Sequence, residues 1–312
     1  MKKILFALLL IAVVCGFSHA QRVYIVGIDG NDAVYWLNGE RHVLPRSGDY
    51  AGANAIAVSG SNIYIVGYDE QYAVYWLNGE RFVLPHSGVE ATAMAIAFSG
   101  SNIYITGYDD SNAVYWHNGG KVILPSEGDF AEATGVAFIG SDVIISGTDY
   151  FFDCCEEDDT CYDSVYWRNG KLFYLAHDNC TSNAYNAYAS GSNFYFLGDE
   201  SRDAVYWLNG NMVKLPGLSK GASAEGMIIS GSNVYIVGSD GSNPVYWLNG
   251  TRTVLPKTGT GHVMATAIAI HGRDIYISGC DGNNAVYWLN GTRTVLPKTS
   301  TAAHAINMLI IQ

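Results

Sequence analysis

Ala33-Val34-Tyr35-Trp36-Leu37-Asn38-Gly39 is the stretch that decides the fold, because close copies of it recur along the whole chain. Each copy has a Val-Tyr-Trp core, and these cores hold all seven tryptophans of the protein, which are Trp36, Trp76, Trp116, Trp167, Trp207, Trp247 and Trp288. They are separated by 40, 40, 51, 40, 40 and 41 residues. A fixed period near 40 residues, with several short strands in each unit, is typical of a propeller or a solenoid.

A single unit predicts four antiparallel strands. In the second unit we expect them over residues 53–58, 63–67, 73–77 and 81–84. A Ser-Gly-Ser-Asn turn separates the first two strands, and Asn78-Gly79, the strongest short hairpin signal, separates the last two. Pro85 ends the fourth strand, where a proline helps to blunt the free edge of a sheet. Four strands joined in this way form a propeller blade.

The two ends of the chain predict a closed ring. The six tryptophan separations total 252 of the 292 residues from 21 to 312, which leaves 40, or one further period. Residues 305–310 resemble an innermost strand without a hairpin partner, and residues 23–26 resemble a second strand without an innermost one. We therefore predict an all-β fold, a seven-bladed β-propeller with four antiparallel strands per blade, in which the C-terminal strand joins the N-terminal blade. A closed ring leaves no terminal blade to be capped.

Residues 1–20 have the pattern of a secretory signal peptide. Lys2-Lys3 precedes an apolar run over residues 4–14, and Ser18-His19-Ala20 predicts cleavage after Ala20. We expect a secreted, periplasmic or cell-surface protein whose residues 21–312 form one domain. The apolar run is short for a membrane span, so no membrane insertion is expected.

The net charge of the chain limits the classes of partner that we expect it to bind. The net charge of −12 becomes −14 once the two lysines of the signal are removed. An acidic surface repels phosphate backbones, which argues against nucleic acid as a partner. The chain is 49% apolar and only 15% charged, with 35 glycines, as expected for a turn-rich β protein. We expect a monomer.

The repeated tryptophans have two interpretations. Blades pack face to face, so an identical tryptophan in every blade is explained most simply by packing between blades. The alternative is a row of stacking platforms for sugars. Side chains alternate along a strand, so Val34 and Trp36 would point to one side and Tyr35 to the other.

Strand order predicts which loops share a face of the ring. The invariant turns and both chain ends would lie on one face. The variable connections (residues 46–52, 86–92, 126–132, 176–183, 217–223 and 257–264) would lie on the other. Function usually sits on loops that a rigid scaffold positions, so the variable face is the candidate binding face.

One variable position lies just inside that face, directly after an invariant alanine. Its occupants are expected at the mouth of the central channel, either as ligand-binding residues or as ordinary filling of an irregular opening. They are Asn54, Met94, Thr134, Tyr185, Glu225, Thr266 and Ile306.

A ring of acidic residues is a second candidate. Each stands two residues after the glycine that ends the second strand, and they are Asp29, Asp69, Asp109, Asp149, Glu200, Asp240 and Asp281. Seven equivalent carboxylates could hold cations or meet a basic partner. Aspartate at a turn also accepts backbone N–H hydrogen bonds, which would make the ring structural.

The fourth unit carries 11 extra residues, with Cys154, Cys155 and Cys161 in the same stretch and Cys180 in the next loop. In an exported protein four clustered cysteines predict two disulfides, with Cys154 and Cys155 each bonded to Cys161 or Cys180. Zinc is an alternative. Calcium could bind Asp153, Glu156, Glu157, Asp158 and Asp159, although their spacing matches no EF-hand loop. We otherwise expect no cofactor. Cys280 is left over, as a buried thiol or a link to another chain.

No catalytic motif is present. The sequence lacks Gly-x-Ser-x-Gly, His-Glu-x-x-His and a glycine-rich phosphate loop. The unit Ser-Asn-Ile-Tyr-Ile-Val-Gly-Tyr-Asp (residues 61–69), followed by Ala-Val-Tyr-Trp-Leu-Asn-Gly, resembles the repeats of secreted bacterial β-propeller proteins of unassigned function. This resemblance covers residues 21–312 and implies no functional residues.

Two functions follow as hypotheses. The first is an exported, non-catalytic binding module that recognises an extracellular or cell-surface protein or glycan through the variable loop face around the channel. The variable loops differ from blade to blade, which favours one composite site over seven repeated pockets. The alternative is an extracellular polysaccharide-active enzyme with its catalytic residues at the channel mouth.

Overall fold

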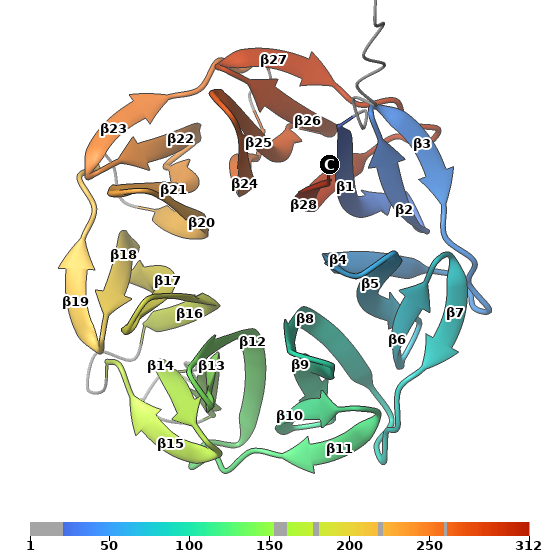
Figure 1. Cartoon of the computed structure of the whole chain (residues 1–312), viewed down its shortest axis with the longest axis vertical. Helices are drawn as coiled ribbons and strands as arrows, with labels where there is room; N and C mark the ends of the chain where they lie inside the picture. The colour runs from blue at the N-terminus through green and yellow to red at the C-terminus, as the bar shows by residue number, and fades with distance from the viewer. Residues whose placement is uncertain (1–20, 153–160, 177–180, 218–220, 259–260, 312) are drawn as a thin grey trace, which may run out of the picture.

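Seven four-stranded antiparallel sheets form a ring in the computed structural model, which describes residues 21–152, 161–176, 181–217, 221–258 and 261–311 (Figure 1). We number these sheets as blades one to seven in chain order. The predicted seven-bladed β-propeller is confirmed. Among the described residues, no helix is long and apolar enough to cross a membrane.

From the innermost to the outermost strand, blades one to four are β28 (Ala303–Ile311), β1 (Arg22–Asp29), β2 (Asp32–Leu37) and β3 (Glu40–Val43); β4 (Ala51–Ser59), β5 (Asn62–Asp69), β6 (Tyr72–Leu77) and β7 (Glu80–Val83); β8 (Ala91–Ser99), β9 (Asn102–Asp109), β10 (Asn112–His117) and β11 (Gly120–Ile123); β12 (Phe130–Ile139), β13 (Asp142–Phe151), β14 (Cys161–Arg168) and β15 (Lys171–Tyr174).

In the same order, blades five to seven are β16 (Ser182–Ser190), β17 (Asn193–Glu200), β18 (Asp203–Leu208) and β19 (Asn211–Lys214); β20 (Ala222–Ser230), β21 (Asn233–Asp240), β22 (Asn243–Leu248) and β23 (Thr251–Val254); β24 (Val263–His271), β25 (Asp274–Asp281), β26 (Asn284–Leu289) and β27 (Thr292–Val295).

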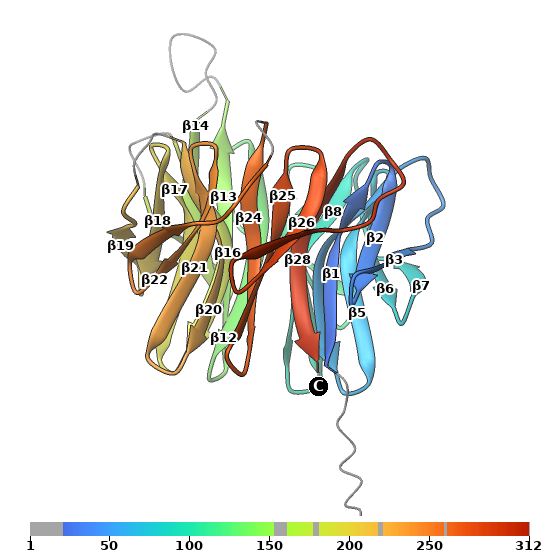
Figure 2. The same cartoon turned by 90° about the horizontal axis from the view of Figure 1, so that it is seen from above.

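Ring closure follows the predicted strand exchange. β28 pairs antiparallel with β1, from Arg22 opposite Ile311 to Asp29 opposite Ala303. β28 is thus the innermost strand of blade one. β28 ends and β1 begins at the lower face of the ring in Figure 2, and the connections from blade to blade run along the upper face. The upper face is therefore the variable face.

The Asn-Gly turns adopt the predicted hairpin geometry. Asn78 and Gly79 have φ values of 51° and 88°, so both central residues are left-handed, as a type I′ turn requires. The side-chain Oδ1 of Asn78 also accepts a hydrogen bond from the Ile63 backbone N at 2.9 Å. The turn therefore links the two outer strands and anchors the second strand beside them.

The tryptophans are packed between blades. All seven side chains are 0–1% exposed, so none offers a ring to solvent. The Trp76 Nε1 donates a hydrogen bond to the carbonyl oxygen of Pro45 in the preceding blade at 2.7 Å, and five other tryptophans repeat this contact. The Trp207 Nε1 has no partner among the described residues. In blade four, Leu175-Ala176 replaces the Leu-Pro pair that supplies this acceptor elsewhere.

Candidate functional site

A β-bulge re-aims one side chain on the innermost strand of every blade. In blade two, Ala53 pairs with Gly67 and Ala55 with Val66, so Asn54 is the extra residue. The other six blades shift register at the equivalent residue. The bulged residues are those predicted for the channel mouth. Bulges often re-aim a side chain beside an active site or at the rim of a barrel.

Glycine in the second strand makes room for this bulge. A Cβ atom added to Gly67 would lie 1.9 Å from the backbone oxygen of Gly52 and 3.1 Å from the Cα atom of Ala53. No larger residue fits without moving the backbone of the innermost strand. The repeated bulge of the innermost strand therefore depends on the repeated glycine of the second strand.

All seven bulged residues line one cavity of about 360 Å³ at the upper end of the channel. A second cavity of about 260 Å³ continues down the channel between the innermost strands. The structure thus brings together residues separated by up to 252 positions in sequence, from Asn54 to Ile306. The wall is asymmetric. Glu132, Tyr185 and Glu225 come from blades four to six, whereas Met94 and Ile306 come from blades three and one.

Three of the bulged residues also tie neighbouring blades together. Asn54 Nδ2 donates a hydrogen bond to the carbonyl oxygen of Ala93 at 2.9 Å. Thr266 Oγ1 donates to the carbonyl oxygen of Ala305 at 2.9 Å. Thr134 makes the equivalent bond to the Ala184 carbonyl at 2.5 Å. These three residues line the cavity and also hold neighbouring blades together. The other four bulged residues are Met94, Tyr185, Glu225 and Ile306, and they form the part of the wall without this structural role.

Glu225 and Tyr185 are the two ionisable residues among the seven bulged residues. Burial raises the pKa of its carboxyl to about 7, although a hydrogen bond from Ser223 acts in the opposite direction. The nearby Asp199 raises it further. Near neutral pH this carboxyl therefore exists in both protonation states, and it can donate as well as accept a hydrogen bond.

Two further acids extend the polar side of the mouth. Burial raises the pKa of Glu132, which accepts a hydrogen bond from the Tyr150 hydroxyl at 2.9 Å. Burial also raises the pKa of Asp199, even though hydrogen bonds from Tyr185 and Asn183 favour its charged form. The Tyr185 hydroxyl donates to Asp199 Oδ1, so this bulged side chain is held by a residue of its own blade.

The acidic ring is buried, not displayed on the surface. Five of its members are at most 1% exposed, and the other two, Asp109 and Glu200, are 2% and 7% exposed. In blade two, Asp69 accepts hydrogen bonds from the backbone N atoms of Ser47 and Gly48, which belong to the connection from blade one. Arg81 of the outermost strand forms an ion pair with the same carboxylate at 2.6 Å. In the same way, backbone N–H groups of the preceding connection donate to the ring acids Asp29, Asp69, Asp109, Asp149 and Asp281, which thus hold the connections between these blades.

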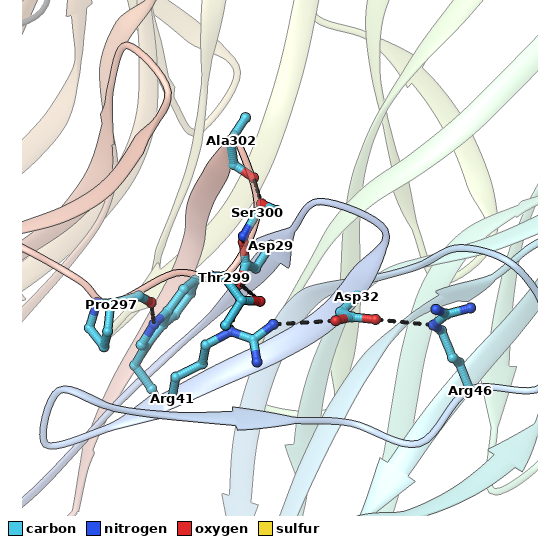
Figure 3. Close-up of polar contacts among 9 residues, drawn as sticks. Asp29, Asp32, Arg41, Arg46, Pro297, Thr299, Ser300 and Ala302 are labelled. Carbon is cyan, nitrogen blue, oxygen red and sulfur yellow. Dashed lines mark hydrogen bonds and ion pairs between the residues drawn. The ribbon is translucent and has the colours of Figure 1, made fainter.

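Figure 3 shows this arrangement where the ring closes. Asp29 accepts backbone hydrogen bonds from Thr299 at 2.8 Å and Ser300 at 3.1 Å, and it pairs with Arg41 at 2.6 Å. Burial by itself would raise the pKa of Asp29, but the hydrogen bonds from Ser300 and Thr299 outweigh it and lower the pKa to about 2. The carboxylate therefore joins the last inter-blade connection to the first blade.

The cysteine cluster lies largely outside the described residues. Cys154, Cys155 and Cys180 fall there, as do the candidate calcium ligands Asp153 and Glu156 to Asp159. Cys161 is buried at the start of β14. Disulfide pairing and calcium binding stay predictions. Cys280 is a buried free thiol, and no group of three or more His, Cys, Asp or Glu in the described part of the chain is arranged to hold a metal ion.

Sequence reasoning missed Glu132 and Asp199. Asp199 had a signal, because the residue just before the ring acid is uncharged in every other blade, where it is Ile28, Tyr68, Tyr108, Thr148, Ser239 or Cys280. Glu132 precedes the invariant alanine of blade four, at a position that holds Gly52 and Thr92 in the two blades before it. In both cases a charge interrupts an uncharged column of the repeat.

Comparison with known proteins supports the fold. No protein-family model matches the chain, and no curated protein matches it by sequence. Among solved structures, apo AztD from Citrobacter koseri is similar over 93% of this chain and 98% of its own, with 11% identity and a TM-score of 0.50.

Two other solved structures resemble the chain less closely in TM-score. The computationally designed Ika8 protein is 19% identical, with 87% of this chain and 79% of that chain covered and a TM-score of 0.49. The calcium-binding protein regucalcin from Agrobacterium tumefaciens is 13% identical, with coverages of 74% and 82% and a TM-score of 0.46. At these identities the likeness concerns the fold alone, and by fold the chain is a β-propeller.

Proposed function

We propose that the protein is an exported, non-catalytic binding module that holds an extracellular glycan or protein at the mouth of its channel. The observation that carries this proposal is the cavity of about 360 Å³ in which the bulged residues of all seven blades meet. Ligand sites of small molecules have volumes of roughly 300–1,000 Å³ and combine an apolar wall with a few convergent polar groups. Met94 and Ile306 supply the apolar wall, and Glu225 and Glu132 the polar groups.

The cavity favours a glycan over a folded protein partner. A protein–protein interface of ordinary stability buries about 800 Å² on each partner, far more than the opening of one such cavity provides. A saccharide unit has an apolar face and a rim of hydroxyls, which suits a wall that is apolar on one side and acidic on the other. A single protruding protein side chain could enter the same cavity, so a protein stays the alternative ligand.

Binding to printed glycans, followed by calorimetry on the residues 21–312 protein, tests the proposal. We expect Met94→Ala and Glu225→Gln to weaken binding about tenfold, the effect of one lost buried contact or hydrogen bond. Glu80→Gln is the matched control, since Glu80 is exposed beside an Asn-Gly turn on the opposite face. If a bound glycan or protein is insensitive to both mouth variants, the channel mouth is not the site.

The second candidate function is a polysaccharide-active enzyme at the same place. The observation that favours it is the carboxyl of Glu225, whose pKa of about 7 suits a general acid at neutral pH, with Glu132 in the same cavity. An enzyme predicts that oligosaccharides are cleaved and that Glu225→Gln abolishes turnover while they still bind. Stable binding without any cleavage product over a day would remove this candidate.

A further inference from the structure

A third cavity opens on the variable face between blades four and five, outside the channel. It measures about 290 Å³ and is lined by Tyr162 of β14 together with Thr181, Asp199, Ser201 and Arg202. Each of these described lining residues carries a hydroxyl, carboxyl or guanidinium group, which distinguishes this cavity from the packing defects of an apolar core.

Asp199 connects this cavity to the cavity at the channel mouth. Its Oδ1 accepts from the Tyr185 hydroxyl, which lines the channel mouth, and from Asn183 Nδ2 at 3.3 Å. Within the described parts of the chain its Oδ2 takes no hydrogen bond. Asp199 thus lines one cavity, and its Oδ1 holds a side chain that lines the neighbouring cavity. An occupant of either cavity would be coupled to the other through this group.

Arg202 stands in an unusual turn between β17 and β18. Ser201 and Arg202 have φ values of 51° and 68°, and no other pair of consecutive non-glycine residues in the described chain is left-handed. Such a conformation costs about 1 kcal/mol per residue. The carbonyl of Arg202 accepts hydrogen bonds from the backbone N atoms of Gly221 and Ala222, both at 2.9 Å, so the next blade holds the turn in place. Strained backbone that the surroundings hold in place is often found at functional sites.

The guanidinium of Arg202 is exposed and makes no ion pair with the described residues. Five other basic side chains in the described part of the chain pair with ring acids and so help to hold the fold. The residues that pair with ring acids are Arg41, Arg81, Lys121, Arg252 and Arg293. The cavity therefore combines a hydrogen-bond donor with five N–H groups, a carboxylate acceptor and an aromatic ring.

We propose that this cavity is a second subsite of the binding module, which holds another unit of the same uncharged glycan. Arg202 would donate hydrogen bonds to saccharide oxygens, Asp199 Oδ2 would accept from a hydroxyl, and the ring of Tyr162 would pack against the apolar face of the sugar. The net charge of −14 that residues 21–312 carry opposes an anionic polysaccharide, which is why an uncharged glycan is favoured. This inference rests on the proposed function, because the channel mouth holds the first unit.

The test uses homo-oligomers of glucose, mannose, galactose and N-acetylglucosamine, from one to six units, titrated calorimetrically into the residues 21–312 protein. We expect Arg202→Ala and Asp199→Asn each to weaken binding of the longer oligomers about tenfold, as expected for a hydrogen bond to a charged group. Binding of the shortest oligomer that the channel mouth holds should change less than twofold in Arg202→Ala, because Arg202 does not line the mouth. Arg273→Ala is the charge-matched control, since Arg273 is exposed in a turn on the opposite face.

The outcomes separate this subsite from the proposed function. If Glu225→Gln weakens binding but Arg202→Ala and Asp199→Asn leave every oligomer length unaffected, the channel mouth stands and the second subsite is wrong. A gain in affinity with length that disappears in both subsite variants supports it. If no oligomer of the panel binds, the subsite for uncharged glycans is wrong as well. Circular dichroism spectra that match the parent protein exclude misfolded variants from the comparison.

Discussion

At the scale of single residues, the indole N–H groups offer an internal comparison. Trp76 and Trp207 are equally buried and occupy equivalent places in blades two and five. Of these two, Trp76 donates a hydrogen bond to the carbonyl oxygen of Pro45, whereas the Trp207 Nε1 has no partner among the described residues. The two tryptophans are therefore packed to a similar extent, and they differ in whether the indole N–H donates a hydrogen bond.

We predict that Trp76→Phe destabilises the protein by about 1 kcal/mol more than Trp207→Phe, because it also leaves the Pro45 carbonyl without its donor. Both variants lose similar packing, so Trp207→Phe is the matched control. Urea unfolding followed by tyrosine fluorescence measures the difference. Equal losses in free energy of unfolding would show that the indole hydrogen bond contributes nothing.

The carboxyl of Glu225 predicts a pH dependence of stability. Its pKa is about 7 in the folded protein and near 4.5 when unfolded, so the folded state retains the proton between these values. Stability therefore falls as the pH rises from about 4.5 through 7, because the buried carboxyl must ionise. Glu225→Gln removes this ionisation. The difference in free energy of unfolding between Glu225→Gln and the parent should therefore shift in favour of the variant by on the order of 2 kcal/mol from pH 4.5 to pH 8.5. Thermal melting across this range checks it; parallel curves would mean that Glu225 titrates normally.

At the scale of elements, the connection that leads from blade seven into β28 is held by the ring acid Asp29. Asp29 has a pKa lowered to about 2, so its contribution is present above pH 4 and is lost as the pH falls through 2. We predict that Asp29→Asn lowers the free energy of unfolding by about 2 kcal/mol at pH 7 and by almost nothing at pH 2. Asp49→Asn is the control, because Asp49 is exposed in the connection between blades one and two. Chemical denaturation at the two pH values decides, and a pH-independent loss would contradict an electrostatic origin.

The strands themselves were predictable from alternation and turn chemistry. In blade two the expected strand over residues 53–58 is Ala51–Ser59, and that over 63–67 is Asn62–Asp69. Asn78-Gly79 marks its turn because few other residue pairs accept two left-handed conformations. The bulge at Asn54 was not predictable, since a bulge depends on how two strands pair and leaves no signature in either strand alone.

At the scale of the whole molecule, closure by β28 predicts tolerance of new chain ends. Arg22 and Ile311 are direct partners, so a short linker can join the native ends. New chain ends can be made between Gly100 and Ser101, in the turn between β8 and β9. They lie on the same face of the ring as the native ends, and β8 and β9 then end and begin the chain in blade three as β28 and β1 do in blade one.

We predict that this circular permutant folds and melts within a few degrees of the parent, because every strand pair is retained. A chain that ends at Ala302 lacks β28 and leaves β1 with an open edge at the channel, so it should not fold cooperatively. Circular dichroism melting and limited proteolysis compare the three proteins. A truncated chain that melts like the parent would show that ring closure is dispensable.

The amino-acid sequence determined the number of blades, the closing strand and the face on which variation gathers. These follow from a repeat of nearly constant length, and counting residues is enough to place equivalent positions such as Asn54 and Glu225 around one axis. Only the tertiary structure decided what those positions contact. Burial raises the pKa of Glu225, and the cavity at the channel mouth forms, because side chains from different blades meet in space. Such proximity across blades has no counterpart in the order of residues within a repeat.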